Sequence, residues 1–383
     1  MRAIVLSGGG ARGSYQIGVW KALRKLKIKY DIVTGTSVGA FNGALMVQND
    51  FFNAKKIWEN MDYKFVFDSK VNIDDFVASL KIYAREFLEG GGFSVNNLEK
   101  NIEKHLKLKK FYRSKIKYGL VTFNSTTLTE KCLSKEEIPK EKLKDYLMAS
   151  ASPFPAFRPV KIDEEKFIDG GFYDVLPINL AVKLGADEII AVDLKSWGFR
   201  KKLKDKTVKI TFIKPRNKLN MFLRFESDVS KRQIRLGYND VMKKYDKLYG
   251  DKYTFKKWGF EKNLKKFDPC AQSLTKKEKI SVIENCGEIF DLDDSLIYNI
   301  KEFNKKISDC IDEIKLVDLK KYDLKDIKLK KIQKQVVKYM ISNYEGDIAL
   351  KIGRLFKKEK LCADYLRCIR KRWKYEKNNF NRR

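Results

Sequence analysis

The stretch that decides the fold reads Asp31-Ile32-Val33-Thr34-Gly35-Thr36-Ser37-Val38-Gly39-Ala40. A short apolar run leads into a Gly-x-Ser-x-Gly pentapeptide centred on Ser37, and a segment of small residues follows. This order predicts a nucleophile elbow, in which a serine lies on a tight turn from a strand to a helix. Gly35 and Gly39 lack a Cβ, so the backbone can approach closely there. The alternative is a glycine-rich turn whose serine is merely solvated.

A second glycine-rich loop precedes this stretch. Residues 2–6 are apolar and predict a buried strand, residues 7–13 read Ser-Gly-Gly-Gly-Ala-Arg-Gly, and residues 14–27 predict a helix with a broad apolar face. The backbone N–H groups of such a loop lie at a helix N-terminus, where anions bind well.

Two functions compete for this loop. The spacing Gly8-x-Gly10-x-x-Gly13, with Asp31 downstream, matches a dinucleotide-binding fingerprint. Alternatively, the amides of Gly9 and Gly10 form an oxyanion hole for acyl transfer. The first interpretation leaves Ser37 without a role, whereas the second uses it directly.

A third motif lies at residues 166–173, which read Lys-Phe-Ile-Asp-Gly-Gly-Phe-Tyr. The pattern predicts that Asp169 ends a strand, with Gly170 and Gly171 behind it. Asp169 is therefore a candidate catalytic acid or base. The alternative is a turn residue that accepts a hydrogen bond from its own backbone.

Composition limits the chemistry and the class of protein. The 383 residues allow about two domains, and a hydrophobic content of 43% is enough for a packed core. Apolar runs stay below the roughly 18 residues that a membrane span needs, and the N-terminus does not resemble a secretory signal. The six cysteines show no zinc-ligand spacing and are expected to be reduced thiols. His105 is the only histidine, which excludes a metal site built from histidines.

The positive charge is concentrated in the second half of the chain. The formal net charge is +31; residues 1–200 carry 32 Lys and Arg against 24 Asp and Glu, and residues 201–383 carry 49 against 26. A basic half favours polyanionic partners such as an anionic membrane surface or nucleic acid. A general lysine bias in the composition is the alternative cause.

In their order and spacing, the three motifs resemble those of the patatin-like phospholipase family. The matching features are the glycine loop from Gly8 to Gly13, the pentapeptide around Ser37 and the Asp-Gly-Gly at Asp169. The segments Ala151-Ser152-Pro153 and Leu176-Pro177 through Asp187 also resemble this family. The resemblance weakens toward residue 255, and residues 256–383 resemble nothing familiar.

The resemblance implies a serine hydrolase with a two-residue catalytic dyad. Ser37 would be the nucleophile and Asp169, ionised and within hydrogen-bond reach, would be its base. The resemblance also implies an oxyanion loop composed of Gly8, Gly9, Gly10, Arg12 and Gly13. The N–H of Val38 is a further candidate donor. Arg12 would hold the loop or face a phosphate headgroup, unless it forms an ordinary surface ion pair. No metal or cofactor is required, so activity is expected to be independent of calcium.

The sequence therefore predicts a three-layer α/β/α domain with a mainly parallel sheet at residues 1–255, and a basic, mostly helical region at residues 256–383. The predicted activity is cleavage of fatty-acyl esters of phospholipids or lysophospholipids. The alternatives are an acyltransferase, a general esterase, or a basic module that binds membrane or nucleic acid with a vestigial dyad.

The expected partner is an anionic membrane surface that contacts the basic half, and nucleic acid is disfavoured. Aromatic and basic residues alternate at residues 221–225 and 369–375, as suits an interface. The expected location is cytoplasmic, with peripheral membrane association.

Overall fold

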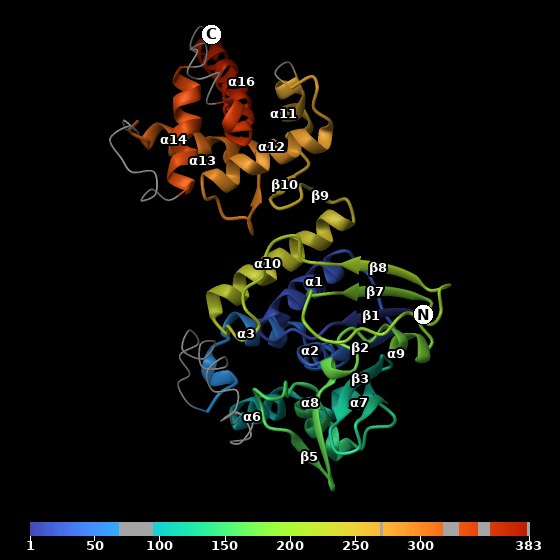
Figure 1. Cartoon of the computed structure of the whole chain (residues 1–383). Helices are drawn as coiled ribbons and strands as arrows, with labels where there is room; N and C mark the ends of the chain where they lie inside the picture. The colour runs from blue at the N-terminus through green and yellow to red at the C-terminus, as the bar shows by residue number, and fades with distance from the viewer. Residues whose placement is uncertain (69–94, 269–270, 317–328, 344–352, 381–383) are drawn as a thin grey trace. The chain divides into compact units, whose positions relative to one another are not determined.

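The computed structural model describes residues 1–68, 95–268, 271–316, 329–343 and 353–380 (Figure 1). The chain divides into two compact units, residues 1–244 and residues 245–383. The sequence placed this division near residue 255. The observed division is earlier because two short strands, β9 (Leu248–Tyr249) and β10 (Thr254–Lys256), pair with β11 (Ile297–Tyr298) in the second unit.

The first unit contains an eight-stranded sheet. Its strands lie in the order β5-β6-β3-β2-β1-β7-β8, and β4 also pairs with β3. The run β3-β2-β1-β7-β8 is parallel, whereas β4, β5 and β6 form antiparallel pairs. The strands are β1 (Arg2–Leu6), β2 (Ile32–Thr36), β3 (Lys117–Asn124), β4 (Thr129–Ser134), β5 (Val160–Ile162), β6 (Glu165–Asp169), β7 (Glu188–Val192) and β8 (Lys209–Ile213).

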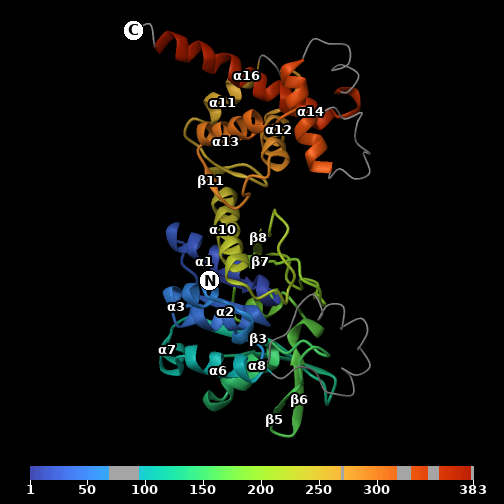
Figure 2. The same ribbon diagram turned by 90° about the vertical axis from the view of Figure 1, so that its left-hand side faces the viewer.

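Helices cover both faces of this sheet (Figures 1 and 2). Neighbouring residues of a strand point to opposite faces. Leu6 and Val33 face α2 (Val38–Val47), while Ala3 and Ile189 belong to an apolar cluster with Ala181 of α9 (Ile178–Lys183). The predicted three-layer α/β architecture with a mainly parallel sheet is confirmed.

The remaining helices of the first unit complete these layers. The long helix α10 packs against α1, and both contact α3; α6 packs against α8, which lies on β3. Strands β3 and β4 form an antiparallel hairpin. The helices are α1 (Ser14–Lys25), α3 (Phe51–Glu59), α6 (Asn96–His105), α7 (Leu108–Arg113), α8 (Leu143–Ser150) and α10 (Ser227–Lys244).

The second unit is mostly helical, as predicted, around a core rich in aromatic residues. Phe255, Phe260 and Phe303 stack or meet edge to face, with ring centroids about 5 Å apart. Across the described part of the whole chain, no helix is long and apolar enough to cross a bilayer. The helices of the second unit are α11 (Phe260–Phe267), α12 (Lys276–Ile289), α13 (Ile300–Glu313), α14 (Leu329–Ser342) and α16 (Lys357–Phe380).

One cysteine of the second unit departs from expectation. Cys368 is disulfide-bonded, whereas Cys132, Cys286, Cys310 and Cys362 are free thiols. The expectation of six reduced thiols is therefore wrong, because disulfide pairing depends on proximity in the fold and not on spacing along the chain. The side chains of residues 370–375, part of the predicted interfacial tail, lie outside the described residues.

Candidate active site

Ser37 occupies a strained turn between β2 and α2. Its backbone dihedrals are φ 58° and ψ −130°, a combination that residues with a Cβ rarely adopt. The turn is tight, because a Cβ at Gly39 would lie 2.4 Å from the carbonyl oxygen of Leu6. A Cβ at Gly35 would collide with the backbone of Gly39 at 2.3 Å. These contacts explain both glycines of the pentapeptide.

Ser150, the last residue of α8, holds this turn in place. Its hydroxyl accepts a hydrogen bond from the Ser37 N–H at 2.8 Å and donates one to the carbonyl oxygen of Val121 at 2.7 Å. Ser150 is fully buried, so both hydrogen bonds are shielded from water. The hydroxyl therefore links the elbow to strand β3.

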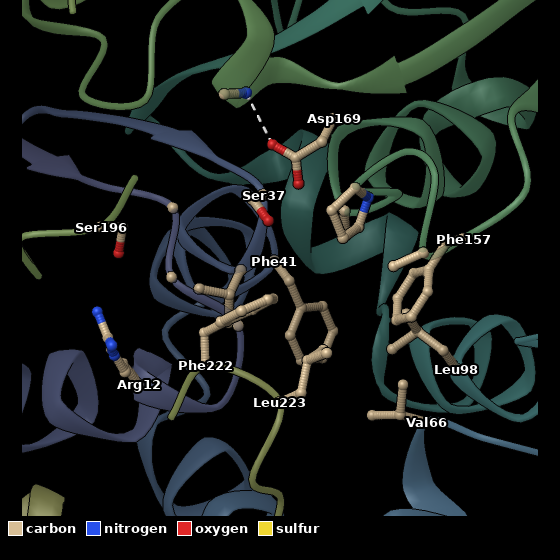
Figure 3. Close-up of a pocket in the computed structure, with 18 of the residues that line it drawn as sticks. Arg12, Ser37, Phe41, Val66, Leu98, Phe157, Asp169, Ser196, Phe222 and Leu223 are labelled. Atoms are coloured by element: carbon tan, nitrogen blue, oxygen red, sulfur yellow. Dashed lines mark hydrogen bonds between the residues drawn. The ribbon is translucent and has the colours of Figure 1, made fainter. Parts of the chain in front are cut away.

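Asp169 ends β6 and is slightly more buried than Ser37, with exposed fractions of 7% and 9%. Its Oδ1 accepts a hydrogen bond from the Gly171 N–H at 2.7 Å (Figure 3). Burial raises the pKa of Asp169 to about 6, and hydrogen bonds from the Ser37 side chain and the Gly171 N–H partly oppose that rise. The carboxyl group is therefore mainly ionised at neutral pH, which lies only about one pH unit above its pKa.

Strand β3 brings the two residues together. Thr36, immediately before Ser37, is opposite Val121 in the parallel pair of β2 and β3. Asp169 is opposite the next residue, Thr122, in the antiparallel pair of β3 and β6. Ser37 and Asp169 therefore flank the same end of β3 and line one pocket. Gly170 is required behind them, because a Cβ there would lie 2.1 Å from the Val121 carbonyl oxygen.

The glycine loop lies against this pair, but its backbone N–H groups differ in whether they are free to donate a hydrogen bond to a ligand. The Gly8 N–H donates to the Val175 carbonyl oxygen at 3.0 Å, so it is not a free oxyanion donor. Among the described residues, nothing accepts a hydrogen bond from the Gly9 or Gly10 N–H, and both residues line the pocket. Gly10 has φ 55°, and a Cβ there would lie 2.2 Å from the Phe222 carbonyl oxygen.

The last two predicted members of the loop, Arg12 and Gly13, differ in whether they line the pocket. Gly13 does not line the pocket; it is a packing glycine, since a Cβ there would lie 2.4 Å from Val38 Cγ2. Arg12 lines the pocket, half buried, and its Nε donates to the Asn220 carbonyl oxygen at 2.9 Å. Burial lowers the pKa of Arg12. Within the described residues Arg12 has no carboxylate partner, in contrast to the surface ion pair considered above.

The pocket that these residues share has a volume of about 560 Å³, the size of a small-molecule site. Figure 3 shows Ser37 and Asp169 on one side, Arg12 and Ser196 on a second side, and apolar residues such as Val66, Leu98 and Phe157 on a third. The Ser196 hydroxyl is buried and has no hydrogen-bond partner among the residues that the structure describes. The pocket therefore has a polar arm, which contains Arg12 and Ser196, and an apolar arm, which contains Val66, Leu98 and Phe157.

Sequence reasoning missed Ser150, Ser196 and the apolar lining. Ser150 lies one residue before the Ala151-Ser152-Pro153 segment that the sequence singled out, which is the only signal that pointed to it. Ser196 follows the strand β7 without any motif. Val66 and Leu98 belong to no motif in the sequence, and only the fold brings them together.

Comparison with known proteins agrees with the geometry. Residues 4–182 match the model of the family described as patatin-like phospholipase. This match indicates a patatin-like phospholipase domain at residues 4–182. This match covers the elbow at Ser37, the glycine loop and Asp169, and it ends within α9.

Several curated proteins are similar to the same part of the chain. Patatin-like phospholipase domain-containing protein 7 of Mus musculus is 28% identical over 201 residues, which are 51% of this chain and 14% of that protein. Lysophospholipase nte1 of Aspergillus terreus is 30% identical over 200 residues, 50% of this chain and 12% of that protein. The probable lipid hydrolase 463L of Invertebrate iridescent virus 6 is 29% identical, over 48% of this chain and 63% of that protein. The chain thus matches only a small part of the two longer relatives.

Among solved structures, VipD from Legionella pneumophila is similar with a TM-score of 0.43 and 15% identity, covering 96% of this chain and 89% of that one. The type III effector protein ExoU is similar with a TM-score of 0.34 and 10% identity, covering 94% of this chain and 73% of that one.

Proposed function

We propose that this protein hydrolyses fatty-acyl esters of phospholipids or lysophospholipids, with Ser37 as nucleophile and Asp169 as general base. The observation that carries the proposal is the convergence of a strained, buried serine and a buried carboxyl group at the junction of a polar and an apolar arm of one pocket. The names of the similar proteins, which include lysophospholipases and a probable lipid hydrolase, support the same reaction class.

The reaction follows from the position of these groups. Asp169 accepts the proton of the Ser37 hydroxyl while Oγ attacks the ester carbonyl carbon. The tetrahedral intermediate collapses, the bond to the leaving alcohol breaks, and Asp169 returns the proton to that alkoxide. Asp169 then takes a proton from water, the resulting hydroxide attacks the acyl-serine, and the fatty acid leaves as the proton returns to Ser37.

The negative charge of the intermediate requires donors that are already in place. The Gly9 and Gly10 N–H groups have no acceptor within the described part of the chain and line the same pocket, so they are the proposed oxyanion donors. Val38 begins α2, whose N-terminus carries a partial positive charge toward the turn. The Gly8 N–H is not proposed as an oxyanion donor, because the Val175 carbonyl oxygen already accepts its hydrogen bond.

The shape of the pocket assigns the two ends of the substrate. The apolar arm with Val66, Leu98 and Phe157 suits an acyl chain. Arg12 has no carboxylate partner, and the Ser196 hydroxyl no hydrogen-bond partner, in the described ranges of the chain, so both suit an anionic headgroup. Together these two arms favour a phospholipid or lysophospholipid over a neutral ester.

The test compares wild type with Ser37→Ala and Asp169→Asn. Each protein is treated with a fluorophosphonate probe, and fatty-acid release from mixed phospholipid vesicles is followed in parallel. Under the proposal, labelling disappears in Ser37→Ala and release is lost in both variants. Ser196→Ala is the matched control, because Ser196 is a second pocket serine without a neighbouring base and should keep labelling.

Other outcomes select the alternatives. Labelling of Ser37 without fatty-acid release would favour an acyltransferase or an esterase for a different acceptor. Neither labelling nor release would favour a binding module on this fold. The expected membrane contact through the basic second half remains a prediction that the same vesicles can test.

A further inference from the structure

Two loops at the pocket mouth expose large apolar side chains. The first rim loop is residues 195–204, after β7, and the second rim loop is residues 218–225, before α10. Trp197 is 82% exposed and Phe199 62%, while Met221 and Phe222 are each 42% exposed. Trp197 and Phe222 also line the pocket. In the described part of the chain, no other exposed large apolar side chain does so.

The backbone of both loops is anchored to the candidate active site. The Phe199 N–H donates to the Gly171 carbonyl oxygen at 2.9 Å, and the Phe199 carbonyl oxygen accepts from Val175 N–H at 2.7 Å. The Phe222 carbonyl oxygen accepts from Ala11 N–H at 2.6 Å. These hydrogen bonds tie the rim loops to the Asp169 turn and to the glycine loop. The apolar side chains are therefore held at the mouth and left uncovered.

The first rim loop is also strongly basic. Residues 195–204 contain five Lys and Arg and no acidic residue. Asp193 neutralises Arg200 through hydrogen bonds of 2.8 and 2.9 Å. Lys202 and Lys204 are exposed, and neither forms an ion pair with a described carboxylate. The loop thus combines uncovered aromatic rings with uncompensated positive charge.

We propose that the rim loops are the surface with which this protein docks on a bilayer containing anionic phospholipid. Trp197, Phe199, Met221 and Phe222 would reach the headgroup region, where aromatic rings are stable, and Lys202 and Lys204 would contact anionic headgroups. The pocket would then open into the leaflet that holds the ester. This placement of docking on the first unit rests on the proposed function, and it differs from docking through the second unit, residues 245–383.

The first experiment measures vesicle binding by the full chain in the Ser37→Ala background, so that lipid is not consumed. Sedimentation is compared for vesicles of phosphatidylcholine alone and of phosphatidylcholine mixed with phosphatidylglycerol. The rim variants are Lys202→Glu/Lys204→Glu and Phe199→Ser/Met221→Ser. The matched controls are Lys109→Glu/Lys110→Glu on α7 and Phe52→Ser/Leu128→Ser, which alter exposed residues that do not line the pocket.

Each rim variant is expected to bind mixed vesicles at least about tenfold more weakly, and each control within about twofold of the parent. Undiminished binding by the rim variants, or an equal loss in the controls, would overturn the proposal. Failure of the parent protein to prefer mixed vesicles would overturn it as well.

A second readout locates the contact. Phosphatidylcholine with brominated acyl chains quenches tryptophan fluorescence in the membrane. If the rim docks, Trp197→Phe removes most of the quenched signal. If the signal persists, an exposed tryptophan elsewhere, such as Trp258 of the second unit, makes the contact and the proposal is wrong.

Hydrolysis separates this inference from the proposed function. With Ser37 restored, Phe199→Ser/Met221→Ser should hydrolyse a soluble short-chain ester at the wild-type rate, because neither side chain lines the pocket. A wild-type protein that binds through the rim but hydrolyses no ester would contradict the proposed function only. A hydrolase whose rim variants still bind would contradict the docking surface only.

Discussion

The hydroxyl of Ser150 accepts a hydrogen bond from the backbone N–H of Ser37 at 2.8 Å. Because Ser37 adopts φ 58°, this contact holds a turn that its own backbone preference does not favour. Ser150→Ala leaves a buried N–H and the Val121 carbonyl oxygen without this partner. We expect about 1–3 kcal/mol less stability and slower fluorophosphonate labelling. Unfolding by urea and labelling rates measure the two effects.

Ser152→Ala is the control for Ser150. Its buried hydroxyl donates only to the Met148 carbonyl oxygen within its own turn, at 2.7 Å. This variant should lose stability without a matching loss of labelling rate. Equal labelling in Ser150→Ala and wild type would contradict a positioning role for Ser150.

The pH dependence of hydrolysis should report Asp169. Its pKa is raised to about 6 by burial, and only the ionised carboxylate accepts the Ser37 proton. We expect kcat/KM for a soluble ester to rise about tenfold per pH unit below about 6 and to level off above it. Asp174 also has a pKa raised to about 6 by burial but does not line the pocket, so Asp174→Asn should keep this profile. If Asp174→Asn abolished the rise of kcat/KM near pH 6, that rise would report Asp174, and Asp169 would be excluded as the base.

The same group should make stability depend on pH. Because the folded pKa of Asp169 is about 6 and its ordinary value is 3.8, its contribution is fully present below about pH 4 and is lost as pH rises through 6. Asp169→Asn removes this loss. The free energy of unfolding of the variant, relative to wild type, should increase by about 2 kcal/mol between about pH 4 and pH 7. Urea unfolding at the two pH values measures it, and a constant difference would refute the raised pKa.

Gly10→Ala should inactivate the enzyme. A Cβ at Gly10 would lie 2.2 Å from the Phe222 carbonyl oxygen, and φ 55° disfavours any side chain. The displaced amide would no longer meet the oxyanion, so we expect kcat to fall by about 10²–10³. Gly43→Ala is the control, since the nearest atoms to its Cβ would belong to side chains and not to the backbone, with Val33 at 3.1 Å and Tyr118 at 3.2 Å. Near-normal kcat in Gly10→Ala would exclude this amide as a donor.

Arg12→Gln should separate anionic from neutral substrates. The guanidinium lines the pocket and pairs with no carboxylate of the described residues, and a charge-assisted hydrogen bond contributes about 1.5–3 kcal/mol. We expect kcat/KM for a soluble short-chain phospholipid to fall about 10- to 100-fold, with a smaller change for a neutral ester. Arg24→Gln, on α1 and outside the pocket, should change neither. An equal loss for both substrates would mean that Arg12 only supports the loop.

Local patterns predicted the scaffold well for a physical reason. A strand that runs into glycines and then a helix is specified by neighbouring residues, so residues 2–6, 32–36 and 166–169 could be assigned before any contact was known. The boundary between the units was less predictable. Strands β9 and β10 are short, and their pairing with β11 depends on residues far along the chain.

By itself, the sequence determined the three-layer fold of the first unit, the turn at Ser37 and the candidate acid at Asp169, because each depends on backbone geometry set by adjacent residues. Only the tertiary structure decided which backbone N–H groups are free to donate and which side chains are buried at the site. Contacts between distant segments occupy the Gly8 N–H with the Val175 carbonyl oxygen and place Ser150 behind Ser37. They also bury Asp169, so that its pKa rises. They also gather the apolar arm of the pocket and leave Trp197 and Phe222 uncovered at its mouth. Hydrogen-bond occupancy and burial depend on partners that no local pattern specifies.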